Sequence, residues 1–172
     1  MPTIGVAVAI PEPWATELQD YRTSVGDAMA ATIPTHITLV PPTEVTDAEL
    51  EKIEVHLSDA AAEVAAFAVH LRGTGTFRPV SPVVFVTLAE GISQCEQLAD
   101  AVRRGPLDVD LAFPYHPHVT VAHDVAEDSL DRAFEELSGF ECEFDVDAFQ
   151  LYVHVHDLGW TPTRYFALNP GT

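Results

Sequence analysis

The sequence predicts an α+β fold with two pseudo-symmetric lobes, antiparallel sheets with helices on the outer faces, and a central cleft. The main observation is a tripeptide, His-x-Thr, that occurs at residues 36–38 and again at 118–120, each time in an apolar, β-branched run entered past a proline. A helix-like stretch precedes each copy, and another helix begins shortly after each. Because no Gly-rich loop follows the first strand, a parallel doubly wound sheet fits poorly.

The first half of the chain supplies the clearest elements. Residues 4–10 alternate large and small apolar side chains, which predicts a central strand with a helix packed closely on its small side. Residues 14–29 carry apolar side chains at helical spacing and predict one helix. After the first motif, Thr46 and Glu49 form a capping box, in which each side chain bonds the other residue's main-chain N–H at a helix start.

The second half repeats the order. Residues 67–71 alternate as a strand and residues 83–88 form a nearly continuous apolar strand. Residues 92–102 predict a helix, for which Ser93 and Glu96 offer a second capping box.

In the C-terminal part, the alternation of apolar residues shifts by one position. A helix is expected to start near Asp128, and alternation then resumes at Cys142. This alternation slips by one residue near Ala148, and one regular strand with a single buried face cannot accommodate such a slip. We therefore expect a β-bulge or a bend there, and a last strand over residues 160–168.

Composition limits the classes of protein that fit. The 172 residues are 47% hydrophobic, which suits a single bilobal domain over residues 1–172. The N-terminus lacks the basic segment of a secretion signal, its apolar run is too short to span a bilayer, and the two cysteines are isolated. We therefore expect a cytoplasmic protein that is not bound to a membrane.

The charge argues for a small substrate. Lys and Arg together number 8 against 27 Asp and Glu, giving a formal net charge of −19. Binding of long nucleic acids normally depends on Lys and Arg that displace counterions, so a long duplex is not expected as a partner. The acidic side chains are expected to form a solvated surface, and the protein is expected to be a monomer.

The repeated motif has the groups needed for phosphate chemistry. Alternate side chains of a strand share a face, so His36 and Thr38 point one way, as do His118 and Thr120. Two such strands can present two imidazoles and two hydroxyls to one cleft. This set can donate and accept protons on either side of a phosphorus atom while binding its oxygens.

On these residues the chain resembles the 2H phosphoesterase superfamily, and within it the bacterial 2′-5′ RNA ligase / RNA 2′,3′-cyclic phosphodiesterase family. The pattern of that family is two His-x-Thr motifs, each followed by a hydrophobic residue, here Leu39 and Val121. The resemblance spans most of the chain in order and spacing, and implies a bilobal fold with both motifs in the cleft. Two departures concern the substrate more than the chemistry: His123 stands where members often have a basic residue, and residues 40–43 do not form a Gly-terminated turn.

The resemblance implies a phosphodiesterase that opens 2′,3′-cyclic phosphates of nucleotides or short RNA ends, with reverse 2′-5′ ligation as a related reaction. It assigns His36 as proton donor to the leaving oxygen and His118 as the base, although the sequence does not fix this order. Thr38 and Thr120 would bind the non-bridging oxygens. This scheme needs no metal and no cofactor.

Two neighbours of the second motif are further candidates. Tyr115 can stack on a nucleobase or serve in packing, and His116 can line the cleft or lie at the surface. A zinc site is an alternative use of the histidines, but the His116–His118 spacing lacks the Cys or carboxylate partners of a zinc signature. A non-catalytic nucleotide-binding or sensor protein with the same cleft is the alternative function.

Overall fold

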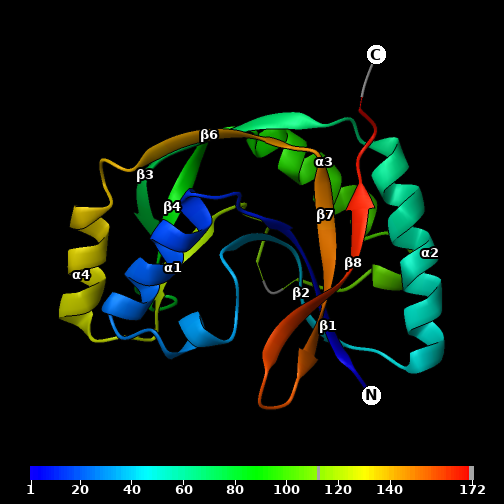
Figure 1. Ribbon diagram of the computed structural model, residues 1–172, viewed down its shortest axis with the longest axis horizontal. Coiled ribbons are helices and arrows are strands. Elements are labelled where there is room, and N and C mark those ends of the chain that lie inside the picture. Colours follow the sequence, from blue (N-terminus) through cyan, green and yellow to red (C-terminus); the bar gives the residue numbers. More distant parts are fainter. Residues whose placement is uncertain (112, 171–172) are drawn as a thin grey trace.

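The computed structural model describes residues 1–111 and 113–170, which form two four-stranded sheets joined by the β6–β7 connection (Figure 1). All strand pairs within the two sheets are antiparallel. In order across the first sheet, the strands are β2 (His36–Glu44), β1 (Thr3–Ala9), β7 (Ala148–Val155) and β8 (Gly159–Ala167). Across the second sheet they are β5 (Val119–His123), β4 (Val83–Glu90), β3 (Phe67–Thr76) and β6 (Glu141–Val146).

Two of the helices pack against the sheet opposite to the one that contains the strand before them. They are α1 (Trp14–Ser24), α2 (Asp47–Glu63), α3 (Ile92–Val102) and α4 (Glu127–Glu136), with short 3₁₀ turns η1 (Ala28–Ala31) and η2 (Gly105–Leu107). Helix α1 follows β1 but packs against β5 of the second sheet, beside α4. Helix α3 follows β4 but packs against β2 of the first sheet, beside α2. Each sheet is therefore covered by one helix from each half of the chain, which confirms the predicted pseudo-symmetric α+β architecture.

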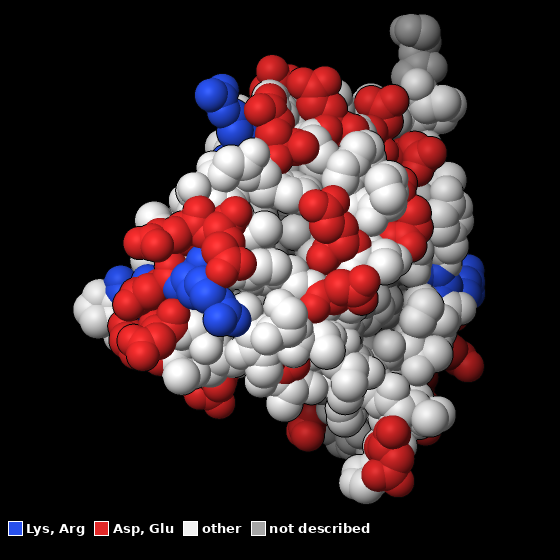
Figure 2. Space-filling view, turned by 60° about the vertical axis from the view of Figure 1, so that its left-hand side comes forward, with Lys and Arg blue, Asp and Glu red and all other residues white. Residues whose placement is uncertain are grey.

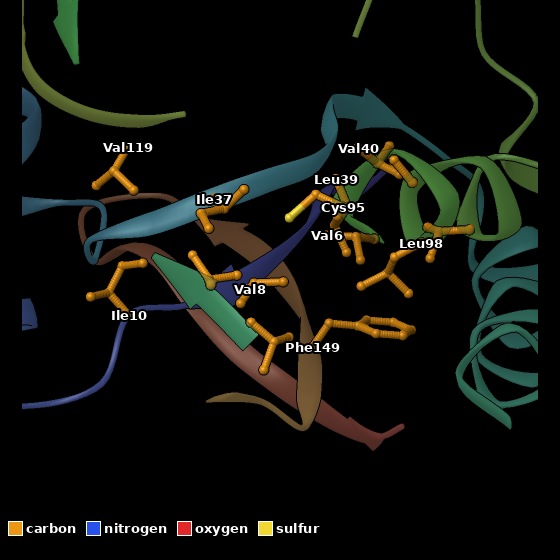
Figure 3. Packing of buried hydrophobic residues seen from close by; sticks show 14 of the residues in the cluster. Val6, Val8, Ile10, Ile37, Leu39, Val40, Cys95, Leu98, Val119 and Phe149 are labelled. Carbon is orange, nitrogen blue, oxygen red and sulfur yellow. The ribbon is translucent and has the colours of Figure 1, made fainter. Parts of the chain in front are cut away.

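The core joins both lobes. Figure 3 shows side chains of β1, β2 and α3 packed together. Of the labelled residues of β2, Ile37 lies nearest to Val119 of β5. Ile37, Leu39, Val119 and Val121 are each at most 1% exposed. Burial of an aliphatic side chain of this size contributes roughly 1.5–3 kcal/mol, so the apolar residues between the motif residues anchor both motif strands.

The predicted helix over residues 14–29 is wrong in its C-terminal part. Helix α1 ends at Ser24, because Gly26 adopts a left-handed conformation with φ +85° and stops the helix. Asp27 then caps the separate turn η1 by accepting a hydrogen bond from the Met29 main-chain N–H.

Of the two predicted capping boxes, one forms. The Thr46 hydroxyl accepts from the Glu49 N–H at 3.1 Å, and the Glu49 carboxylate accepts from the Thr46 N–H at 2.8 Å, at the start of α2. The box at Ser93 is wrong, because α3 starts at Ile92 after Gly91, whose φ is +98°. Ser93 is therefore already inside the helix.

The prediction of a helix on the small side of the first strand is also wrong. Gly5 and Ala7 of β1 instead line a cavity together with Trp160 of β8. The phase slip near Ala148 has a different explanation from a bulge: the chain bends at Asp147, leaves the second sheet at the end of β6 and enters the first sheet as β7. Among the described residues, no helix is long and apolar enough to cross a membrane.

The contrast between the two boxes yields a stability prediction. Thr46→Ala should lower the free energy of unfolding by about 1 kcal/mol, because the Glu49 main-chain N–H in the first turn of α2 loses its acceptor. Ser93→Ala should change it by less than about 0.5 kcal/mol, because Ser93 caps nothing. Urea unfolding followed by circular dichroism measures both, and equal losses in the two variants would contradict the assignment.

Candidate active site

Both motifs occupy equivalent positions in the fold. β2 and β5 are each the edge strand of their sheet, paired with the strand that opens each half, β1 or β4. The two edge strands lie close together where the sheets meet. Along each, the His and Thr are half-buried while the residues between and after them are fully buried. The alternation that the sequence predicts therefore turns the four polar side chains away from the core.

The two imidazoles make the same hydrogen bond. His36 Nδ1 lies 2.6 Å from the Pro34 carbonyl oxygen, and His118 Nδ1 lies 2.6 Å from the His116 carbonyl oxygen. Since a carbonyl oxygen can only accept, each Nδ1 carries the proton and donates it. The neutral ring then has its lone pair on Nε2, the tautomer that a general base needs.

An aromatic wall surrounds the second histidine. Phe77, which follows β3, stands at 89° to the His118 ring with the ring centres 4.9 Å apart, and Phe85 of β4 lies at 5.2 Å. Removal from water disfavours the charged imidazolium, and this burial lowers the pKa of His118 to about 4. Positive charge on His116 or His36 acts in the same direction, against the opposing hydrogen bond to the His116 carbonyl oxygen.

The first histidine is shifted in the same direction. Burial is the main cause that lowers the pKa of His36, and the Arg22 guanidinium adds to it, against the opposing hydrogen bond to Pro34. Both rings are therefore neutral in the free protein at pH 7. An unperturbed histidine has a pKa near 6.5, which would allow one ring to be charged at neutral pH, whereas burial favours the neutral form of both.

Two hydrogen bonds between residues far apart in the sequence lie at this point, and the first of them joins the lobes. The Tyr115 hydroxyl donates to the Thr38 carbonyl oxygen at 2.7 Å. The His123 main-chain N–H donates to Asp27 Oδ2 at 3.0 Å, and the buried Asp27 also pairs with the buried Arg22 at 2.8 Å. His123, which departs from the family pattern, thus contributes its main-chain N–H to this hydrogen bond with Asp27.

A cavity of about 100 Å³, partly open to solvent, adjoins the first motif. Its walls include His36 and Thr38 but also Tyr152 of β7 and Trp160 of β8, two aromatic residues that sequence reasoning did not select for the site. The small side chains of β1 make room here: a Cβ at Gly5 would lie 3.5 Å from the Trp160 ring. The alternation of small residues, such as Gly5 and Ala7, with large apolar residues in β1 was the sequence signal that could have indicated a cavity.

The other candidates are placed as follows. His116 is exposed, and its ring lies 5.8 Å from that of His118. Tyr115 is half-buried and packs against the core. Within residues 1–111 and 113–170, no three His, Cys, Asp or Glu side chains are grouped as metal ligands would be.

Comparison with known proteins assigns the family. The model of the 2′-5′ RNA ligase superfamily matches residues 10–158. The chain belongs to this superfamily.

Other members share the length and the fold. A proposed phosphoesterase of Oceanobacillus iheyensis is 29% identical over 144 residues, which cover 83% of this chain and 84% of that protein. One of Bacillus licheniformis is 27% identical over 157 residues, covering 88% and 92%. Among solved structures, Escherichia coli LigT with 3′-AMP superposes with a TM-score of 0.74 at 21% identity, covering 98% of this chain and 99% of LigT. Thermus thermophilus TT0787 gives 0.69 at 24% identity, covering 98% of each chain. These structures support the two-lobed fold.

The surface of this superfamily member is strongly acidic. Figure 2 shows Asp and Glu spread over the face that carries α4, with few Lys or Arg among them. Some of these basic groups are paired with the acids: Arg78 contacts Glu127 and Asp131 of α4 at 2.9 and 2.7 Å. No broad basic surface is seen on this face.

The depressed pKa of His118 predicts a specific acid sensitivity. Between pH 6.5 and about 4 the unfolded chain binds a proton on His118 that the folded protein does not. Stability should fall as pH decreases through this window, by at most about 1.4 kcal/mol per pH unit from this residue, and the residue should have no effect above pH 6.5. His118→Gln should lose less stability than wild type between pH 7.5 and 4.5, as measured by urea unfolding. A His118 ring resonance that titrates near pH 6.5 in NMR spectra would contradict this prediction.

Proposed function

We propose that this protein hydrolyses 2′,3′-cyclic phosphates of nucleotides or short RNA ends without a metal ion, in the cytoplasm. The observation that carries the proposal is the pair of equivalent histidines, each with Nδ1 hydrogen-bonded to a main-chain carbonyl oxygen, on two edge strands that meet between the lobes. Membership of the 2′-5′ RNA ligase superfamily supports chemistry at a phosphodiester.

The reaction needs one base and one acid. His118 Nε2 takes a proton from water, whose oxygen attacks phosphorus. The bond from phosphorus to one ribose oxygen breaks, and the His36 Nε2–H protonates that oxygen. The product is a nucleoside monophosphate with a free neighbouring hydroxyl. The Phe77 and Phe85 rings around His118 favour its neutral form, which suits the role of base.

The substrate itself favours the protonated form of His36 that an acid needs. An anionic phosphate near His36 favours the charged imidazolium, so binding should raise the pKa that burial lowers in the free protein. Thr38 and Thr120 would hydrogen-bond the non-bridging oxygens, where negative charge grows during attack. His116, exposed beside His118, is a further candidate contact for the phosphate.

The cavity beside His36 offers a place for the nucleobase. If His36 protonates the leaving ribose oxygen, the base attached to that ribose lies on the His36 side, where Trp160 and Tyr152 form apolar walls. LigT has been crystallised with 3′-AMP, ATP and NADP⁺. We infer that this chain likewise accepts small nucleotides. With a ribose 5′-hydroxyl in place of water, the same step would join a 2′,3′-cyclic phosphate end to that hydroxyl in a 2′-5′ linkage: the new P–O5′ bond forms, the P–O3′ bond breaks, and the acid protonates the 3′ oxygen.

The first test removes the histidines. Purified protein should convert 2′,3′-cyclic AMP to a monophosphate in the presence of EDTA, as measured by chromatography of the products. His36→Ala and His118→Ala should each lower kcat by about 10²–10⁴-fold, because each removes a positioned proton-transfer group. The double variant should lose less than the product of the single losses, since the two groups act as a unit.

A surface histidine supplies the control. The side chain of His156 is 94% exposed in the β7–β8 turn, and His156→Ala should keep wild-type turnover. Wild-type protein that binds the cyclic nucleotide and returns it unchanged would instead identify a sensor and exclude the hydrolase.

The second test concerns the base-binding cavity. Trp160→Ala should raise KM for 2′,3′-cyclic AMP roughly tenfold or more with kcat largely kept, because stacking of a base on an aromatic ring contributes about 1–3 kcal/mol. Tyr165→Ala is the matched control, since Tyr165 lies on the same strand and is 62% exposed, outside the cavity. A cyclic phosphate of ribose without a base should not distinguish Trp160→Ala from wild type. Unchanged KM for cyclic AMP in Trp160→Ala would place the base elsewhere.

A further inference from the structure

The segment that leads into the second motif contacts the strand of the first motif. Tyr115 lies three residues before His118, and its hydroxyl donates to the main-chain oxygen of Thr38, two residues after His36. One hydrogen bond of 2.7 Å thus connects the main chain that carries one catalytic candidate with the segment that carries the other.

The Tyr115 ring is held in place from several sides. It packs against the core, and the Arg103 guanidinium at the end of α3 lies over its face, 5.4 Å from the ring centre. Burial raises the pKa of the Tyr115 hydroxyl above its ordinary value, so the group stays a neutral donor. Its donor role is therefore insensitive to pH in the range where the histidines titrate.

The acceptor also requires this contact. β2 is an edge strand, so carbonyl groups on its outer side have no neighbouring strand to bond. A main-chain oxygen shielded from water needs a donor, and Tyr115 supplies one to Thr38. A main-chain oxygen at the edge of one sheet thus gains its hydrogen-bond donor from a side chain of the other lobe.

We propose that Tyr115 is a positioning residue whose hydroxyl bond to the Thr38 main chain fixes the spacing between His36 and His118, so that both rings reach the same phosphate. The proposal rests on the proposed hydrolase function. It differs from a stacking role for Tyr115, because Tyr115 then acts through Thr38 and does not touch the nucleotide. Acid–base catalysis is sensitive to such spacing: a displacement of about 1 Å can lower a rate by roughly 10²-fold.

Tyr115→Phe tests this proposal, because it keeps the ring and its contact with Arg103 and deletes only the hydroxyl. We expect kcat for 2′,3′-cyclic AMP to fall about 10- to 100-fold, with KM changed less than about threefold. Tyr21→Phe is the matched control: the Tyr21 hydroxyl also makes a bond distant in sequence, 3.1 Å from Glu136, but at the surface between α1 and α4. Tyr21→Phe should keep wild-type kcat, and thermal melts should show both variants folded.

A second readout needs no turnover. In wild type the His118 ring should titrate near pH 4 by NMR, and in Tyr115→Phe its pKa should rise toward 6.5, because water enters as the strands separate. Inorganic phosphate should perturb both histidine resonances at lower concentration in wild type than in Tyr115→Phe.

The outcomes separate the two proposals. Tyr115→Phe with wild-type kcat, or with reduced kcat but unchanged His118 titration, would overturn the positioning role. Wild-type protein that leaves cyclic AMP intact would overturn the hydrolase function, while the NMR comparison would still decide whether Tyr115 sets the spacing of the histidines.

Discussion

Two edge strands from different sheets meet in this protein, and each is hydrogen-bonded to the segment that leads into the other. Each of these bonds joins a segment that precedes one motif to the strand of the other: Tyr115 to Thr38, and Asp27 to the main chain of His123. Asp27 is buried with its charge paired to Arg22. A buried carboxylate left unpaired is costly, so this contact holds the segment after α1 against the strand of the second motif.

The second constraint is the scarcity of positive charge. With a net charge of −19, the protein as a whole repels a phosphate anion, and the two histidines of the site are neutral in its free state. In the proposed function, binding would therefore depend on hydrogen bonds of the site and on apolar contact in the cavity beside His36. In the proposed reaction, the substrate anion would favour protonation of the acid, so that the positive charge forms together with the complex.

The sequence predicted local structure well where one segment contains all the interacting groups. The Thr46–Glu49 box formed because both partners lie within one turn of the same helix. The same pattern at Ser93 failed because Gly91 starts the helix two residues earlier. The phase slip near Ala148 was a correct signal of a break, but the sequence alone did not show that the chain changes sheets there.

The amino-acid sequence by itself determined which side chains share a face: a strand alternates with period two, so the repeated His-x-Thr motif turns its polar groups away from a buried apolar set. It also indicated the family and the fold class. Only the tertiary structure decided which strands face each other, that α1 and α3 cross to opposite sheets, and that Trp160 and Tyr115 come to the first motif. The reason is that periodicity encodes the burial of one segment against an unspecified neighbour, whereas the identity of that neighbour depends on packing between segments that are far apart in the chain.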